Sequence, residues 1–147
     1  MSRVPLSDEE RLVVLAGQAG EDLRELDAGQ QEQVLQRLLD IIEAEAKPSA
    51  YVREKIADLD IIAAGDTPRL YTKIVEDVPR GNATYHVVFV LYIDYTHDYP
   101  GPAFKEYSEE AALLLEKTTE LEVVDELEAY LDSLDALDAD ALQQLLS

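Results

Sequence analysis

Two neighbouring segments, residues 69–77 and 84–95, constrain the fold of this 147-residue chain more than any other feature. Both are rich in β-branched and aromatic residues, which favour β-strands. They are separated by a run of residues that supply turns, Pro79-Arg80-Gly81-Asn82. The pattern predicts a β-hairpin with a loop of moderate length.

The second of these strands is apolar on both of its alternating faces. One face carries Val87, Phe89, Leu91 and Ile93, and the other carries Val88, Val90 and Tyr92. A strand with one face in water alternates apolar and polar residues, so this pattern is typical of a central strand covered on both sides.

The chain before the hairpin predicts a strand followed by two helices. Residues 11–16 form a compact apolar run that ends at Gly17 and suits a buried strand, with a first helical turn as the alternative. From residue 18 to residue 46 the apolar residues recur at helical spacing, with a break at residues 27–29. Asp27 is the residue that we expect to cap the second helix.

Pro48 ends this helical region and opens another amphipathic stretch. Its apolar residues are Tyr51, Val52, Ile56 and Leu59. This spacing predicts a third helix, while the short segment 60–66 is ambiguous between helix and strand.

After the hairpin, Pro100-Gly101-Pro102 ends the strand, and Ser108 is the expected N-cap of an acidic helix. The apolar stripe of this region consists of Leu114, Leu121, Val124, Leu127, Leu131 and Leu134. Asp138 is placed to cap a short terminal helix. The predicted fold is therefore α+β, in which an N-terminal strand and helical hairpin pack on a small antiparallel sheet, followed by acidic C-terminal helices.

Charge divides the chain into two regions. The sequence has 12 Lys and Arg against 32 Asp and Glu, a formal net charge of −20. Residues 1–105 carry −8, whereas residues 106–147 hold 13 acids and one base and carry −12. We therefore predict an α+β domain over 1–105 and an acidic helical extension over 106–147, which packs on the domain or on a partner.

The acidity has two interpretations. A net charge of −20 repels polyanions, so strong nucleic-acid binding in ordinary buffer is not expected. Dispersed acids with few lysines resemble the composition of proteins from organisms that live in molar salt, where the Debye length is about 3 Å. The alternative is that the carboxylates imitate the phosphates of a nucleic acid and occupy an enzyme that binds it.

Other features exclude several classes of protein. There is no cysteine, which removes disulfides, thiolate catalysis and cysteine-ligated metals. No apolar run approaches the ~20 residues of a membrane span, and the first residues lack a signal-peptide pattern, so we expect a cytoplasmic protein. His86 and His97 are eleven residues apart, on opposite faces of a regular strand, and no phosphate-binding loop is present. Neither a metal nor a cofactor is expected.

A strand, a helical hairpin with an "L-D" break and then antiparallel strands is the layout of the RelE/ParE toxin superfamily. The chain resembles this family over about residues 11–99. The matching features are Leu12 to Ala16, the run Glu21 to Asp27, the run Gln33 to Ile42, Arg69-Leu70-Tyr71, and Tyr95-Thr96-His97-Asp98-Tyr99. Asp98 departs from the family pattern, because an Arg is expected after His97.

This resemblance implies a metal-independent endoribonuclease, in which a ribose 2′-hydroxyl attacks the adjacent phosphate. The implied catalytic residues are Arg69, His97 and Tyr99. The implied substrate-binding residues are Tyr71, Lys73 and Arg80. The structural alternatives are a hydrogen-bonded surface histidine, ordinary ion pairs for the cations, and packing for the tyrosines.

The sequence thus predicts a RelE/ParE-like relative in a toxin–antitoxin type system, either RNA-cleaving or inactive and covered by its own acidic tail. The implied partners are an antitoxin-like protein and RNA or the ribosome. In this hypothesis residues 108–147 cover the face that bears Arg69, Lys73 and Arg80, or else pair with a second copy through the leucine stripe. The alternative is a non-enzymatic acidic interaction protein, such as a viral inhibitor that mimics nucleic acid and blocks a host defence enzyme.

Overall fold

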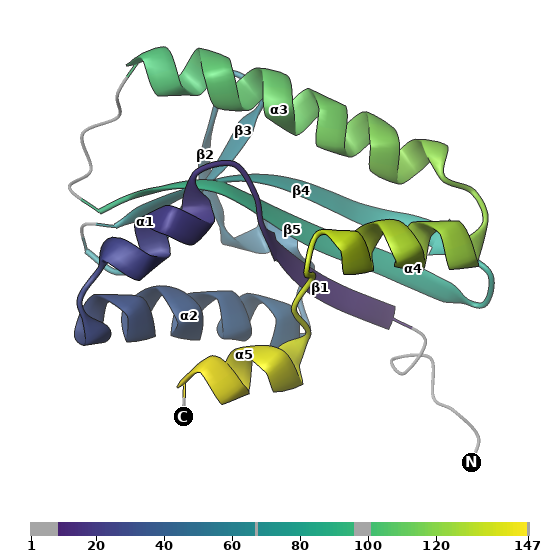
Figure 1. Cartoon of the computed structure of the whole chain (residues 1–147), viewed down its shortest axis with the longest axis horizontal. Coiled ribbons are helices and arrows are strands. Elements are labelled where there is room, and N and C mark those ends of the chain that lie inside the picture. Colours follow the sequence, from purple (N-terminus) through teal and green to yellow (C-terminus); the bar gives the residue numbers. More distant parts are fainter. Residues whose placement is uncertain (1–8, 67, 96–100, 147) are drawn as a thin grey trace.

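The computed structural model describes residues 9–66, 68–95 and 101–146 and confirms an α+β fold with an N-terminal strand (Figure 1). In chain order the elements are β1 (Glu9–Leu15), α1 (Ala19–Glu25), α2 (Ala28–Glu43), a 3₁₀ turn (Pro48–Tyr51), β2 (Val52–Ile56), β3 (Leu59–Ala63), β4 (Arg69–Arg80), β5 (Ala83–Asp94), α3 (Gly101–Glu120), α4 (Val124–Ser133) and α5 (Ala139–Leu146). No helix in these ranges is long and apolar enough to cross a membrane.

The predicted hairpin is confirmed and lies at the middle of a five-stranded sheet of order β1-β5-β4-β3-β2. β1 pairs parallel to β5, and the other pairings are antiparallel, so the sheet is mixed. The hairpin strands extend through Pro79 and Arg80, which leaves Gly81 and Asn82 as the turn. Gly81 has a φ of +59°, a conformation that glycine adopts without steric cost.

Helices cover both faces of the sheet, as the two apolar faces of β5 require. α1, α2 and α5 lie on one face, and α3 and α4 lie on the other (Figure 1). Neighbouring residues of one strand therefore enter different cores: Val13 and Val88 pack toward α2, while Val14 and Phe89 pack toward α3. Burial on both faces explains the near-continuous apolar run.

A β-bulge corrects the predicted faces at the end of β5. Tyr71 pairs with Tyr92, but Thr72 pairs with Val90, so Leu91 is an extra residue in β5. An inserted residue moves every later side chain to the opposite face. As a result Ile93 packs in the core beside α2, and Tyr92 packs in the core beside α3.

The predicted third helix over residues 48–59 is wrong. After the 3₁₀ turn, residues 52–56 and 59–63 form the hairpin β2–β3. Ala57, with a φ of +56°, lies in its tight turn. The ambiguous segment is strand because β3 pairs with β4 over residues 69–72, a contact that local spacing does not reveal.

The expected caps have mixed outcomes. Asp27 caps α2 in a capping box with Gln30, and Asp138 accepts from the backbone N–H of Ala141 at 2.8 Å, as predicted. Ser108 is not an N-cap, because α3 begins at Gly101. Its buried hydroxyl instead accepts a hydrogen bond from the backbone N–H of Asp58 at 3.2 Å and ties α3 to the β2–β3 turn.

The acidic C-terminal segment contributes to both cores. Leu127 and Leu131 of α4 are buried on the α3 face, at 0% and 2% exposure. Leu137 then pairs with Val13 at the free edge of β1, and the chain passes to the other face, where Leu142 of α5 is fully buried beside α2. The boundary between residues 105 and 106 falls inside α3.

Candidate functional site

Arg69 and Tyr71 meet Asp94 at one end of the sheet. Arg69 pairs with Asp94 in the β4–β5 register, and the Tyr71 hydroxyl donates to Asp94 Oδ2 at 2.9 Å. The Tyr71 ring is fully buried, stacked on Phe104 at 4.9 Å and tilted against Tyr92 at 5.1 Å. Tyr71 is therefore a core residue and offers no surface to a substrate.

Arg69 organises the chain that leads into β4. Its side chain is buried, and its Nη1 donates to the carbonyl oxygen of Pro68 at 3.0 Å and to those of Gly65 and Asp66 at 3.4 Å. These bonds hold the connection between β3 and β4. His97 and Tyr99, the other two predicted catalytic residues, lie outside the described residues.

Arg80 lies at the opposite end of β4. Its Nε donates to the Leu121 carbonyl at 2.6 Å and its Nη2 to the Thr119 carbonyl at 2.8 Å, so it caps the C-terminal end of α3. Eleven residues of strand separate it from Arg69, which is roughly 35 Å. The two guanidinium groups therefore do not contact the same phosphate.

Lys73 and Arg80 line a cavity of about 500 Å³ between β4 and α3, with Leu115 and Thr119 on the helix side. The Lys73 ammonium is 3.5 Å from the carbonyl oxygen of Asp58. The C-terminal segment thus covers Arg80 with its backbone, while Arg69 is buried elsewhere. The four predicted site residues that the structure describes, Arg69, Tyr71, Lys73 and Arg80, do not form one open basic site.

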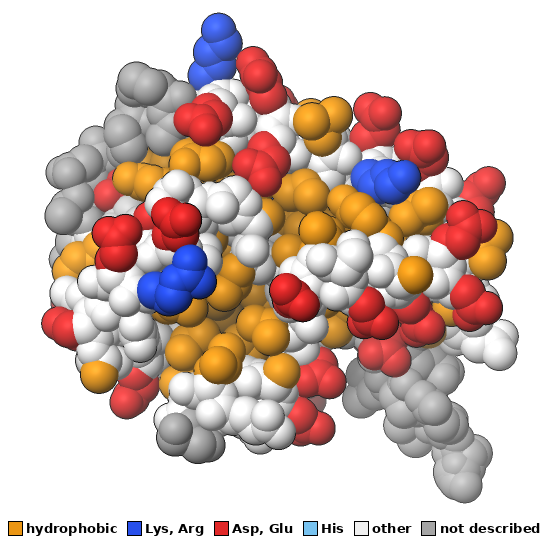
Figure 2. Space-filling view, in the orientation of Figure 1, with side chains coloured by type: hydrophobic (Ala, Val, Ile, Leu, Met, Phe, Trp, Pro, Cys, Tyr) orange, Lys and Arg blue, Asp and Glu red, His pale blue; other side chains and the backbone are white. Residues whose placement is uncertain are grey.

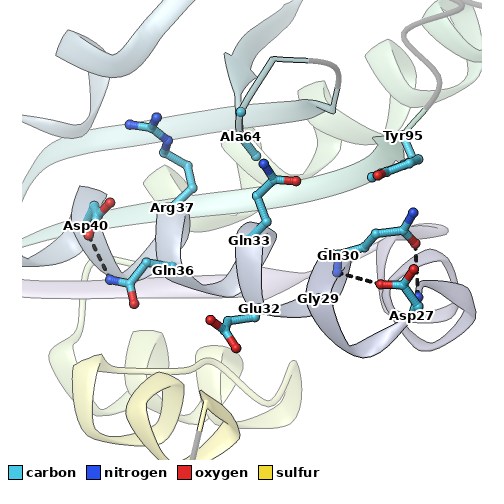
Figure 3. A pocket seen from close by; sticks show the side chains of 11 residues that line it. Asp27, Gly29, Gln30, Glu32, Gln33, Gln36, Arg37, Asp40, Ala64 and Tyr95 are labelled. Carbon is cyan, nitrogen blue, oxygen red and sulfur yellow. Dashed lines mark hydrogen bonds between the residues drawn. The ribbon is translucent and has the colours of Figure 1, made fainter.

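A polar cleft of about 600 Å³ separates α2 from the ends of β3 and β5 (Figure 3). Figure 3 shows Gln30, Gln33 and Arg37 on its helix wall, with Ala64 and Tyr95 on the sheet side. The Gln33 amide lies close over Gly65, where a Cβ would stand only 2.2 Å from its nitrogen.

The polar groups of this cleft are partly used within the protein. The amide of Gln30 completes the α2 cap, and that of Gln36 donates to Asp40 at 2.9 Å. Arg37 lies 5.8 Å from the centre of the Tyr51 ring. The sequence does not identify these side chains as part of a cleft. Polar residues on one face of a helix are also what an ordinary solvent-exposed face shows.

His86 is buried and serves the sheet. Its Nε2 lies 3.0 Å from Glu9 Oε1, and its Nδ1 accepts the backbone N–H of Asp77 at 3.2 Å. Asp77 is the residue at the second β4–β5 irregularity, with a φ of +60°. No group of three or more metal-ligating side chains occurs among the residues that the structure describes.

A third arginine has the same kind of role as Arg69 and Arg80. Arg11 donates to the carbonyl oxygens of Ala44 and Ala46 at 2.9 Å, where α2 ends, and forms an ion pair with Glu9 at 3.1 Å. These three guanidinium groups are directed at backbone carbonyls. Arg69 and Arg80, two of the three cations predicted for the site, are therefore used in holding the fold.

The carboxylates of the C-terminal segment, by contrast, face solvent. Of the 13 acids between residues 106 and 140, all but Glu110 are exposed. None of them forms an ion pair within 4.0 Å with a described Lys, Arg or His. Figure 2 shows acidic side chains along both α3 and α4. Among the described residues, no close ion pair neutralises these carboxylates, and Lys117 is the only base that residues 106–147 contain.

Burial perturbs a few groups beside this surface. Burial raises the pKa of the Glu110 carboxyl, although the backbone N–H of Gly17 partly opposes the shift. Burial also raises the pKa of Tyr107 to about 12. The Tyr85 hydroxyl, whose pKa is raised by burial and by its 2.8 Å bond to Glu128, links β5 to α4. These groups attach the acidic helices to the sheet.

No protein-family model, no curated protein and no solved structure matches this chain. The resemblance to the RelE/ParE superfamily therefore stays a prediction from the sequence.

Proposed function

We propose that the protein is a non-enzymatic acidic interaction protein whose partner presents a basic surface. One observation carries this proposal: the exposed acids of residues 106–140 have no ion-pair partner among the described residues. Like charges that face one another across a helix surface destabilise the fold, and a cationic partner relieves that repulsion. The interaction is strongest at low ionic strength.

The spacing of the acids supports a partner that also binds nucleic acid. From Glu106 to Glu120, α3 is roughly 21 Å long and holds four exposed acids, the partly buried Glu110 and one base, Lys117. A DNA strand presents about six phosphates over the same length, at one per 3.4 Å. α3 therefore approaches the linear charge density of one strand, and α4 adds four more acids.

Competition with duplex DNA for a basic DNA-binding domain of known structure tests this function. We expect the wild type to displace DNA from the domain, and the variant E106Q/E109Q/E116Q/E120Q to do so about tenfold less well. The matched control, E21Q/E25Q/E32Q/E43Q, removes four exposed acids from α1 and α2. An equal loss in both variants, or no displacement by the wild type, would contradict the proposal.

A second candidate is the RNA-cleaving RelE/ParE-like relative. It rests on the sequence resemblance, in which Arg69, paired with Asp94 in the β4–β5 register, precedes the segment that contains His97 and Tyr99. Expression of the wild type and of Arg69→Ala, scored for growth arrest and transcript cleavage, tests it. Equal growth of both strains with intact transcripts would remove this candidate.

A further inference from the structure

The surface between α3 and α4 is apolar, in contrast to the acidic helices that form it. A cavity of about 390 Å³ lies there, and we call it the α3–α4 groove; it is lined by Glu110, Leu113, Leu114, Glu116, Lys117, Glu120 and Tyr130. Figure 2 shows apolar side chains gathered between the two helices, with acidic side chains around them.

Leu113 leaves an apolar surface open to solvent at this groove. Its side chain is 66% exposed, the largest value among the described large apolar residues. Val123, in the connection between α3 and α4, is 53% exposed. Isolated exposed leucines are common on protein surfaces. Here, however, Leu113 borders a hollow that also contains Leu114 and the half-buried Tyr130.

The charges around the groove indicate what chemistry fits it. Glu110, Glu116 and Glu120 line the α3 wall of the groove, where Lys117 is the single lining cation. A second copy of the chain would bring the same carboxylates against these, which is unfavourable below molar salt. A basic occupant is therefore complementary to the rim, and an acidic one is not.

The shape of the groove indicates which secondary structure fits it. The groove runs between two helices, so it presents side chains and no open strand edge to pair with. A helix that packs against two helices inserts apolar residues at spacings of three and four. The α3 residues that line the groove extend from Glu110 to Glu120, roughly 15 Å, so two to three turns of a partner helix span it.

We propose that the α3–α4 groove binds an amphipathic basic helix of a partner protein, with its apolar stripe on Leu113 and Tyr130 and its Lys or Arg residues on the glutamates of the rim. This inference rests on the proposed function and adds the site and the form of the partner. The carboxylates attract the basic partner before contact, and the apolar groove then favours a partner helix with an apolar stripe.

The test uses the full chain and a synthetic 18-residue peptide with Leu and Lys at helical spacing. A scrambled peptide of the same composition carries the same charge but no apolar stripe. We expect the patterned peptide to bind the wild type at least tenfold more tightly than the scrambled one. Leu113→Ser should weaken the patterned peptide about tenfold and leave the scrambled peptide unchanged. The control Leu145→Ser changes a leucine of α5 that is 54% exposed, and should bind like the wild type.

The outcomes separate the two proposals. Equal binding of both peptides, with no effect of Leu113→Ser, would overturn the groove and leave the acidic interaction surface standing. The absence of binding to either peptide at low salt would count against both. Sedimentation of the wild type in 2 M salt tests self-association. A dimer that Leu113→Ser dissociates would show that a second copy occupies the groove, which would also overturn the proposal.

Discussion

Two regions of the fold differ in their balance of acids and bases. Residues 47–80, which form the 3₁₀ turn and β2 to β4, hold six acids and six bases and contribute nothing to the net charge of −20. Residues 106–147 hold 13 acids and one base. The balanced segment pairs its charges internally, as in Lys47 with Asp77 at 2.8 Å, whereas the acidic segment does not.

This difference favours a local cause for the acids of residues 106–147, in addition to any adaptation to salt. Adaptation to salt would place acids over the whole surface, including the edge strand β2, where Arg53 and Lys55 are exposed. The edge instead keeps mixed charges, which discourage pairing with another strand. The excess acids lie on helices that also contribute buried leucines, so the charged surface and the core come from the same segment.

The largest expected effect tests whether the acidic segment is truly part of the core. Leu142→Ala removes a fully buried side chain of α5 and should lower the free energy of unfolding by about 2–5 kcal/mol. Urea unfolding measures the loss. Leu145→Ala, in the same helix but 54% exposed, should change stability by less than about 0.5 kcal/mol. Equal effects would mean that α5 does not pack as described.

The next largest loss of stability is expected at the contact between β4, in the balanced segment, and α3, in the acidic segment. Arg80→Ala removes the charge-assisted hydrogen bonds from the hairpin to the carbonyls of Thr119 and Leu121, and should cost about 1.5–3 kcal/mol. The control Lys117→Ala deletes an exposed cation of α3 and should cost less than about 0.5 kcal/mol. If the two variants unfold at the same urea concentration, the hydrogen bonds of Arg80 contribute no stability beyond that of an exposed positive charge.

A smaller effect, with the opposite sign, is expected from the surface acids. Asp132→Asn with Asp135→Asn removes two exposed charges near the C-terminal end of α4, and each should add about 0.3–1 kcal/mol of stability at low ionic strength. Thermal unfolding in 10 mM and 1 M salt measures this gain, which should disappear in 1 M salt.

The control for this gain lies in the balanced segment. Asp58→Asn with Asp66→Asn also removes two exposed acids, but from a region in which acids and bases are equal in number. It should give no gain. A gain of the same size in both variants would mean that total charge, and not its location, limits stability.

The two regions should also differ in their response to pH. The hydrogen bond from Lys47 lowers the pKa of Asp77 below its ordinary 3.8, whereas burial raises the pKa of Glu110 above its ordinary 4.5. The contribution of Asp77 is therefore present at neutral pH and is lost as the pH falls. The contribution of Glu110 is present in acid and is lost as the pH rises through its raised pKa.

Asp77→Asn and Glu110→Gln measure these contributions. Relative to the wild type, Asp77→Asn should become less stable as the pH rises from 3 to 7, and Glu110→Gln should become more stable over the same range. Urea unfolding at several pH values provides the comparison. Glu109→Gln removes the exposed neighbour of Glu110, and its stability relative to the wild type should change less with pH than that of Glu110→Gln. Differences of the same sign for Asp77→Asn and Glu110→Gln would contradict the assignment.

Local patterns were sufficient for part of the fold. The β4–β5 hairpin follows from β-branched residues on either side of a turn, and the caps at Asp27 and Asp138 follow from one polar residue before an apolar run. The helix predicted over residues 48–59 is wrong because β2 forms by pairing with β3, and β3 in turn pairs with β4. The cap predicted at Ser108 is wrong because α3 begins seven residues earlier, at Gly101, and the hydroxyl of Ser108 instead contacts Asp58, fifty residues away in the sequence.

The candidate sites were harder to predict than the fold. Arg69, Tyr71 and Arg80 are residue types that can hold a phosphate, but their partners are the carbonyls before β4, the carboxylate of Asp94 and the end of α3. Predicting the α3–α4 groove would require knowing which leucine of the apolar stripe is left exposed after the helices pack. Sequence spacing indicates that a helix has an apolar face, and does not indicate how much of that face its neighbours cover.

The sequence by itself determined the central hairpin, the capped helices and the concentration of acid after residue 105, because each depends on residues a few positions apart. The tertiary structure decided the rest. It directed Arg11, Arg69 and Arg80 to backbone carbonyls, and it left Leu113 exposed. These outcomes depend on contacts between distant segments, whose energies exceed the local preferences that a sequence pattern displays.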